Sequence, residues 1–206
     1  MKVDRTRIVE TALDVLNEKG VDGLTTRLIA DRLGVRQPAL YWHFKNKRAL
    51  LDAMNSEILA RGHTHRGPLP GQDWRAFLRE NARSFRRALL AYRDGARVHA
   101  GTEADPDDLG QIERQLAFVV AGGFPPLKAM ELLIAISHYT VGCVLEEQAD
   151  MSQSPDRAAL DAAARAYPLL SEALAHYRDS GHAQLFEAGL DLLLDGAAGR
   201  LAALSR

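Results

Sequence analysis

The sequence has almost no cysteine, no secretory leader pattern and no long apolar run. Cys143 is the only cysteine in 206 residues, which excludes a disulfide framework within the chain and fits a reducing cytoplasm. The first ten residues are charged, and no apolar run approaches the roughly 20 residues that a membrane-spanning helix needs. We therefore expect a soluble cytoplasmic protein in which Cys143 packs as a small hydrophobic side chain.

Patterns of strands, repeats and catalytic groups are also missing. Apolar residues recur at helical spacing rather than in alternation, so the chain is expected to be all-α. No serine, cysteine or carboxylate pair stands in a catalytic context, and no pair among the seven histidines has a metal-binding spacing. We therefore expect a protein that is not an enzyme. Its hydrophobic residues make up 47% of the chain, which is enough to bury a sizeable core.

Between Leu24 and Lys47 the sequence predicts a helix, a glycine turn and a second, short helix. Thr25 is a suitable N-cap for the first helix, and Gly34 supplies the left-handed residue that ends it. Pro38 then opens the second helix at its first position, where no amide donor is needed. The second helix carries donors and aromatics instead of an apolar stripe, which favours a DNA-recognition helix; an ordinary helical bundle is the alternative.

Charge favours the DNA-binding interpretation. Residues 1–48 contain ten Lys and Arg against six Asp and Glu, a net charge of +4, whereas residues 49–206 carry a net charge of −5. The basic end of the chain is therefore the end with the helix-turn-helix. From the residue types alone, we expect Gln37 to contact a base edge, and Tyr41 and His43 to position the head on the DNA backbone. Phosphate contacts are expected from Arg27, Lys45, Lys47 and Arg48.

In the rest of the chain, capping residues, glycines and prolines mark where the expected helices begin and end. A helix over 127–148 is apolar on nearly every face, so it must be buried on all sides. This helix and the last one imply a dimer that places two DNA-binding heads on one duplex, with a core inside one chain as the alternative. The head is expected to begin with a helix over 4–19. Beyond the head, helices are expected over 46–61, 74–92, 94–101, 107–121, 127–148, 168–179 and 183–204. Loops are expected at 62–72 and 149–166, the second of which contains a possible short helix over 158–166.

Several stretches resemble the TetR family of bacterial transcription regulators, and its tetracycline-responsive members in particular. In the head these stretches are DGLTTR, QPALYWH and KNKRALLDA, and in the body FRRALLAYRDGARVHAGT and ISHYTVGCVLE. The resemblance implies a three-helix DNA-binding head over 1–48 and a helical ligand-binding and dimerisation body over 49–206. It further implies a homodimeric repressor that binds a palindromic operator and is released by a tetracycline–magnesium chelate.

The resemblance also implies the site residues. DNA contact is assigned to Arg27, Gln37, Pro38, Tyr41, Trp42, His43 and Lys47. The polar edge of the inducer is assigned to His63, Asn81 and Gln115, its rings to Phe85, and the apolar walls to Ile112, Leu116, Met130, Leu133, Ile134 and Ser137. Magnesium is assigned to His99 directly and, through water, to Thr102 and Glu146 of the partner subunit.

Two departures from the family pattern bear on specificity. Arg36 and Ala39 stand in the recognition region where an acidic residue and a threonine are usual, so the operator is expected to differ there. Glu103 and Ala104 stand beside the magnesium end of the pocket in place of arginine and proline. Two alternatives stay open: a TetR-type repressor for another polycyclic or apolar ligand, and a helical ligand-binding or scaffold protein that never meets DNA.

Overall fold

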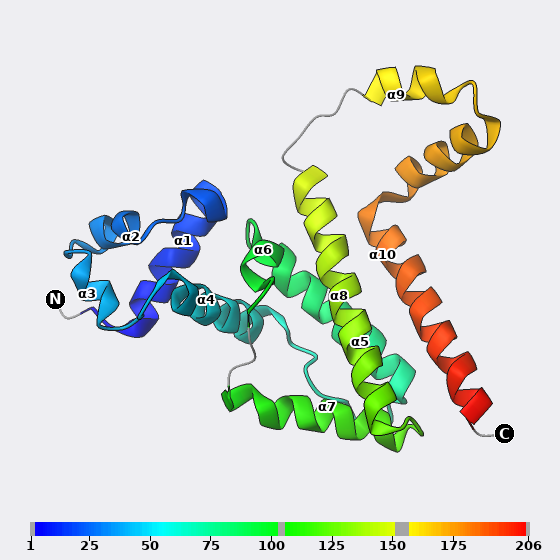
Figure 1. The fold of residues 1–206 in the computed structure, drawn as a ribbon, viewed down its shortest axis with the longest axis horizontal. Helices are drawn as coiled ribbons and strands as arrows, with labels where there is room; N and C mark the ends of the chain where they lie inside the picture. Colours follow the sequence, from blue (N-terminus) through cyan, green and yellow to red (C-terminus); the bar gives the residue numbers. More distant parts are fainter. Residues whose placement is uncertain (1–2, 103–105, 151–156, 205–206) are drawn as a thin grey trace. The chain divides into compact units, whose positions relative to one another are not determined.

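The computed structural model describes residues 3–102, 106–150 and 157–204, which are helical with no strand among them, as predicted (Figure 1). Internal contacts divide the chain into two compact units, 1–145 and 146–206. The elements in chain order are α1 (Arg5–Gly23), α2 (Thr26–Leu33), α3 (Pro38–Tyr41), α4 (Lys47–Gly62), α5 (Trp74–Leu90), α6 (Gly95–His99), the 3-10 turn η1 (Pro106–Asp108), α7 (Leu109–Ala121), α8 (Pro126–Asp150), α9 (Arg157–Ala164) and α10 (Pro168–Leu204).

The predicted N-caps are confirmed. The side chains of Thr25, Asn46 and Asp73 accept from backbone amides in the first turns of α2, α4 and α5, at 3.2, 2.8 and 2.7 Å. Each bond satisfies one of the amide donors that a helix start leaves without a partner. These short polar residues therefore set where three of the helices begin.

The turn between α2 and α3 also forms as expected. Gly34 has φ 68° and ψ 30°, and its amide donates back to the end of α2. The amide of Val35 donates to the carbonyl of Ala30 at 3.0 Å, and the Val35 side chain packs half-buried against the core. Pro38 then starts α3, so the two helices meet at a fixed angle.

Some boundaries differ from the sequence prediction. The segment expected to be helical from Asp107 begins as the 3-10 turn η1 and becomes α-helical only at Leu109. The short helix expected over 158–166 spans Arg157–Ala164. Helix α10 contains the two predicted C-terminal helices, with a break at Gly181, where φ is 67°.

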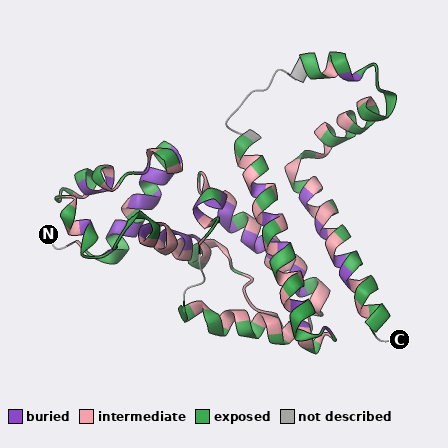
Figure 2. Ribbon diagram, viewed as in Figure 1, coloured by how far each residue is buried: buried purple, intermediate pink, exposed green. Residues whose placement is uncertain are grey.

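One hydrophobic core runs through the first unit from the head into the body (Figure 2). Helix α4 lies within this core and packs against α1, α5 and α6. Its side chains Leu50, Met54 and Ile58 are at most 1% exposed. The same cluster includes Leu16 of α1 and Val98 of α6, so the head is joined to the body by packed side chains rather than by a linker.

Polar contacts tie the end of α1 to the turn before α6. The carboxylate of Asp94 accepts from the amide of Val21 at 2.8 Å. Arg97 forms a two-point ion pair with Asp22, at 2.9 and 2.8 Å. Asp94 itself has φ 55° in the left-handed region, which is uncommon for a residue other than glycine, and its bond to α1 offsets part of that strain.

The helix expected over 127–148 to be buried on all sides is only partly buried within the single chain. Among the described residues of α8, one stripe is buried, formed by Ala129, Ile136, Thr140 and Val144. Leu127 is 67% exposed and Ile134 45%. By length and composition Pro126–Ala149 could cross a membrane, contrary to the expectation that no apolar run is long enough, and only 22% of its apolar window is buried.

Gly20 and Gly34 give a matched test of the contact between α1 and α6. Gly20 has φ 70° and ψ 174°, and a Cβ there would lie 2.7 Å from the Asp94 carboxylate, whereas a Cβ at Gly34 meets nothing within 4 Å. We expect Gly34→Ala to lower the free energy of unfolding by about 1 kcal/mol and Gly20→Ala by about 3 kcal/mol, because the latter also breaks the Asp94 bond. Urea unfolding at one protein concentration measures both; equal losses would contradict the contact.

Candidate DNA-binding surface and ligand pocket

Helix α3 and its flanks form an exposed surface rich in aromatic and basic residues. Trp42 is 89% exposed and Tyr41 is 50% exposed, whereas Leu40 of α3 is buried in the core. Solvent-exposed aromatics of this size are unusual unless a partner covers them. The other predicted DNA contacts are exposed too, apart from half-buried Gln37; they are Arg27, Pro38, His43 and Lys47.

Two of the residues expected at DNA have partners inside the chain. The Nε2 of Gln37 donates to the hydroxyl of Thr26 at 2.8 Å, which ties the start of α3 to α2. Arg48 pairs with Asp52 one turn along α4 at 2.9 Å. Gln37 therefore keeps its amide oxygen as an acceptor, and a phosphate contact by Arg48 would compete with an exposed and weak ion pair.

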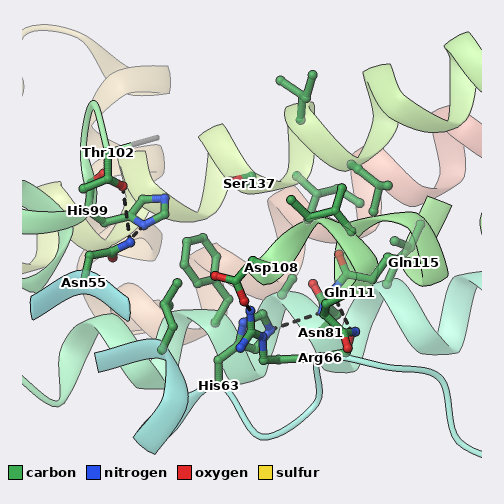
Figure 3. Close-up of a pocket in the computed structure, with 18 of the residues that line it drawn as sticks. Asn55, His63, Arg66, Asn81, His99, Thr102, Asp108, Gln111, Gln115 and Ser137 are labelled. Carbon is green, nitrogen blue, oxygen red and sulfur yellow. Dashed lines mark hydrogen bonds and ion pairs between the residues drawn. The ribbon is translucent and has the colours of Figure 1, made fainter. Parts of the chain in front are cut away.

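A cavity of about 340 Å³ lies in the body between α4, α5, α7 and α8 (Figure 3). Its size falls within the range of small-molecule sites. Its lining includes eleven of the twelve residues that the resemblance assigned, within one subunit, to the inducer or its magnesium: His63, Asn81, Phe85, His99, Thr102, Ile112, Gln115, Met130, Leu133, Ile134 and Ser137.

Leu116 is the exception, because it is not among the lining residues. On α7 the lining residues Gln111, Ile112 and Gln115 recur at helical spacing and form one stripe. Leu116 is half-buried and lies next to Gln115 of that stripe, so its assignment to the pocket wall stays a prediction that this lining does not include.

At one end of the pocket, Asn81 orients His63. The Nδ2 of Asn81 donates to the carbonyl of His65 at 2.9 Å and approaches the Nε2 of His63 at 3.1 Å. Because a carbonyl can only accept, the amide nitrogen must face this way, so Nε2 of His63 accepts and Nδ1 carries the proton. Burial, helped by the positive charge of Arg66, lowers the pKa of His63 to about 4. His63 is therefore neutral at physiological pH.

At the other end, His99 is held by two side chains. Its Nδ1 lies 2.9 Å from the Oδ1 of Asn55, and the Nδ2 of Asn55 donates to the hydroxyl of Thr102 at 3.3 Å. That hydroxyl donates to the carbonyl of His99 at 2.7 Å. Burial lowers the pKa of His99, which keeps its ring neutral and able to bind a metal. Phe85 lies between the two histidines, with ring centres 5.5 Å from His63 and 5.0 Å from His99.

The loop after α4 forms the remaining polar wall. Gln115 donates to the backbone carbonyl of Arg66 at 2.6 Å, and Gln111 donates to the same oxygen. The Arg66 guanidinium pairs with Asp108 at 2.5 Å. Together these bonds fix the loop against α7, and they place a charged pair in the wall of a pocket whose other described lining residues carry no formal charge.

The sequence did not single out Asn55, Arg66, Asp108 or Gln111 as lining residues. Asn55 could have been found, because it interrupts the apolar stripe of α4 at helical spacing from Leu51 and Leu59. Residues 103–105, where Glu103 and Ala104 depart from the family pattern, lie outside the described residues. The metal role of Glu146 of the partner subunit, like the role of every other predicted site residue, stays a prediction.

The neutrality of His63 predicts a pH effect on stability. In the unfolded chain a histidine titrates near 6.5, whereas the folded pKa is about 4, so between these values only the unfolded chain binds the proton. The stabilisation is complete above pH 6.5 and is lost as pH falls toward 4, by about 3 kcal/mol in total. Urea unfolding of the parent and of His63→Gln should show this difference.

The control for that experiment is His43→Gln, which removes an exposed imidazole. It should leave the pH dependence of the parent unchanged. A His63→Gln protein whose stability falls between pH 6.5 and 4 as steeply as that of the parent would contradict the neutral, buried His63.

A helix-turn-helix head that shares one core with a polar-lined pocket defines a DNA-binding regulator with a small-molecule site. Residues 8–54 match the family described as bacterial regulatory proteins, tetR family, and residues 67–201 match the tetracyclin repressor-like C-terminal domain. The chain belongs to this tetR family, which confirms the resemblance seen in the sequence.

Relatives and solved structures match along nearly the full length. Tetracycline repressor protein class A from transposon 1721 of Escherichia coli is 51% identical over 97% of this chain and 92% of its own. The structure of class A TetR in complex with 5a,6-anhydrotetracycline and magnesium has a TM-score of 0.77 and 44% identity, covering 96% of this chain and 99% of that one. A minocycline complex of a TetR variant from Acinetobacter baumannii AYE has a TM-score of 0.80 and 46% identity, covering 95% and 96%.

Proposed function

We propose that this protein is a tetracycline-responsive transcriptional repressor of the bacterial cytoplasm, which binds a palindromic operator as a homodimer and leaves it on binding a tetracycline–magnesium chelate. The observation that carries the proposal is the pocket itself. His63 and Asn81 stand at one end, His99 and Thr102 at the other, with Phe85 between them. Relatives matched along nearly the whole chain are tetracycline repressors, and the two solved complexes contain tetracycline-class ligands.

DNA binding is assigned to the exposed surface of α3. In this proposal Gln37 meets a base edge, Tyr41, Trp42 and His43 lie against the backbone, and Lys47 meets a phosphate. One head contacts too few base pairs for specific binding, so two heads must be held about 34 to 36 Å apart to enter successive major grooves. Arg36 and Ala39 are then the residues expected to alter operator preference relative to other repressors.

Magnesium is part of the inducer and not a resident cofactor in this proposal. No cluster of three or more His, Cys, Asp or Glu occurs in the part of the chain that the structure describes. That scarcity fits a hard cation whose other ligands are inducer oxygens and water. His99, which is half-buried and neutral, would hold the ion directly, and Thr102 and Glu146 of the partner subunit would do so through water. The ion would supply positive charge to the oxygens of the inducer at this end of the pocket.

The inducer assignment predicts a separable phenotype for His99→Ala. Because His99 lies outside the DNA-binding surface, the variant should bind operator with parental affinity and the parental loss of affinity with salt, yet it should fail to leave DNA at an inducer concentration that releases the parent. Gel shifts with and without tetracycline, magnesium and chelator measure this. His176→Ala, an exposed histidine outside the pocket lining, is the control.

A titration of the parent protein with tetracycline, with and without magnesium, would show whether the proposal fails. A parent protein that shows no saturable, magnesium-dependent tetracycline binding is a TetR-type repressor of another ligand. The Arg66–Asp108 pair is the observation that favours this second candidate, since a charged pair in the wall suits a polar ligand of different shape. Titration with apolar and polycyclic compounds would then identify the class.

Dimerisation predicts which leucines must stay apolar. Most of α8 is uncovered within the chain, and Leu192 of α10 is 76% exposed. If a second subunit covers Leu192, Leu192→Glu buries a charge and should weaken the dimer by at least tenfold, which is about 1.4 kcal/mol. Leu69→Glu, at a 56% exposed loop position, is the matched control and should leave the dimer intact. Analytical ultracentrifugation distinguishes these outcomes.

A further inference from the structure

Asn55 is a buried polar residue in the middle of the apolar side of α4. It is 7% exposed, and its neighbour Met54 is fully buried. A buried amide costs free energy unless its donor and acceptor are both satisfied. Figure 3 shows Asn55 pointing from α4 to His99 and Thr102, at the end of the pocket assigned to magnesium.

The hydrogen bonds around Asn55 have one consistent direction. The hydroxyl of Thr102 lies 2.7 Å from the carbonyl oxygen of His99, and because a carbonyl only accepts, the hydroxyl donates its proton there. Asn55 must then turn its NH2 group toward the Thr102 oxygen, at 3.3 Å, and its carbonyl oxygen toward the ring of His99. The Nδ1 of His99, 2.9 Å from that oxygen, therefore carries the ring proton.

These hydrogen bonds determine which nitrogen of the His99 ring carries the proton. A neutral imidazole has one protonated and one unprotonated nitrogen. With the proton on Nδ1, the lone pair is on Nε2, which is the nitrogen left to bind a ligand. Partners that set the tautomer and orientation of a ligating histidine change metal affinity by 10- to 100-fold when they are removed.

We propose that Asn55 is the positioning residue that joins α4 to the inducer end of the pocket: it holds His99 in its Nδ1–H tautomer and links both His99 and Thr102 to the helix that begins at the DNA-binding head. This inference rests on the proposed function for the identity of the inducer. The tautomer itself is a property of the protein without ligand.

The position of Asn55 along α4 gives it a second role. It lies eight residues after Lys47, about 12 Å along the helix from the DNA end. A movement of α6 or of Thr102 therefore reaches α4 through two direct bonds, in addition to the apolar contacts. Asn55 thus acts through His99 and α4, without contact to DNA.

The first test observes the tautomer in the ligand-free protein. In 15N-histidine-labelled parent, the His99 signals, assigned by their loss in His99→Gln, should show a protonated Nδ1 and an unprotonated Nε2. Asn55→Leu removes the acceptor and should shift the population toward the other tautomer. Asn55→Asp keeps an acceptor oxygen and should retain the Nδ1–H form. A parent with the proton on Nε2 overturns the proposal.

The second test measures magnesium-dependent inducer binding by tetracycline fluorescence. Asn55→Leu should weaken binding with magnesium by at least tenfold, and should change binding with chelator by less than threefold. Operator affinity without inducer should stay within threefold of parent, which shows that the fold and the head are intact. Equal losses with and without magnesium would mean a merely structural amide and overturn the proposal.

Asn17→Leu is the matched control, because Asn17 also accepts a bond across elements, from the amide of Arg93 at 3.0 Å, but lies outside the pocket lining. It should leave the His99 signals and magnesium dependence unchanged. If the parent itself shows no magnesium-dependent tetracycline binding, the proposed function fails, while the tautomer experiment still decides the role of Asn55.

Discussion

The packing of α4 between the head and the body is the contact on which the rest of the structure depends. Leu50, Met54 and Ile58 of α4 all belong to the core shared by the head and the body, and each is at most 1% exposed. A core packed at the density of an organic crystal does not absorb small displacements by compression. A shift of the helices that line the pocket must therefore move α4, whose first residue, Lys47, follows shortly after the last residue of α3, Tyr41.

Polar contacts at two levels of burial accompany this core. The Arg97–Asp22 pair between the α6 region and α1 is exposed, so salt screens it. The Asn55 bonds to His99 and Thr102 are partly buried and involve no net charge, so they are far less sensitive to salt. The contacts of the α6 region with α1 and with α4 therefore differ in how strongly they depend on ionic strength.

Local chemistry was the most predictable part of the fold. Thr25, Asn46 and Asp73 cap their helices, and Gly34 turns the chain, because each of these effects involves residues within a few positions of one another. The pocket was predictable only through family resemblance, since its walls come from helices far apart in the sequence. Arg66 and Asp108 are 42 positions apart and belong to a loop and a turn, so no periodicity points to their pairing. Helix α8 shows a related limit: an apolar pattern predicts burial, but it does not say whether the covering surface comes from the same chain.

The continuity of the core also bears on how such regulators can be recombined. Residues 1–48 look like a cassette in the sequence, yet Leu16 of α1 and Val98 of α6 share one hydrophobic cluster, and Asp94 accepts from the amide of Val21. A chimera joined at residue 48 would set an unfamiliar head surface against α4 and α6, creating voids and clashes at the same time. Exchange of operator specificity between relatives is therefore easier through the exposed residues of α3 and its flanks, which touch the solvent and leave the shared core unchanged.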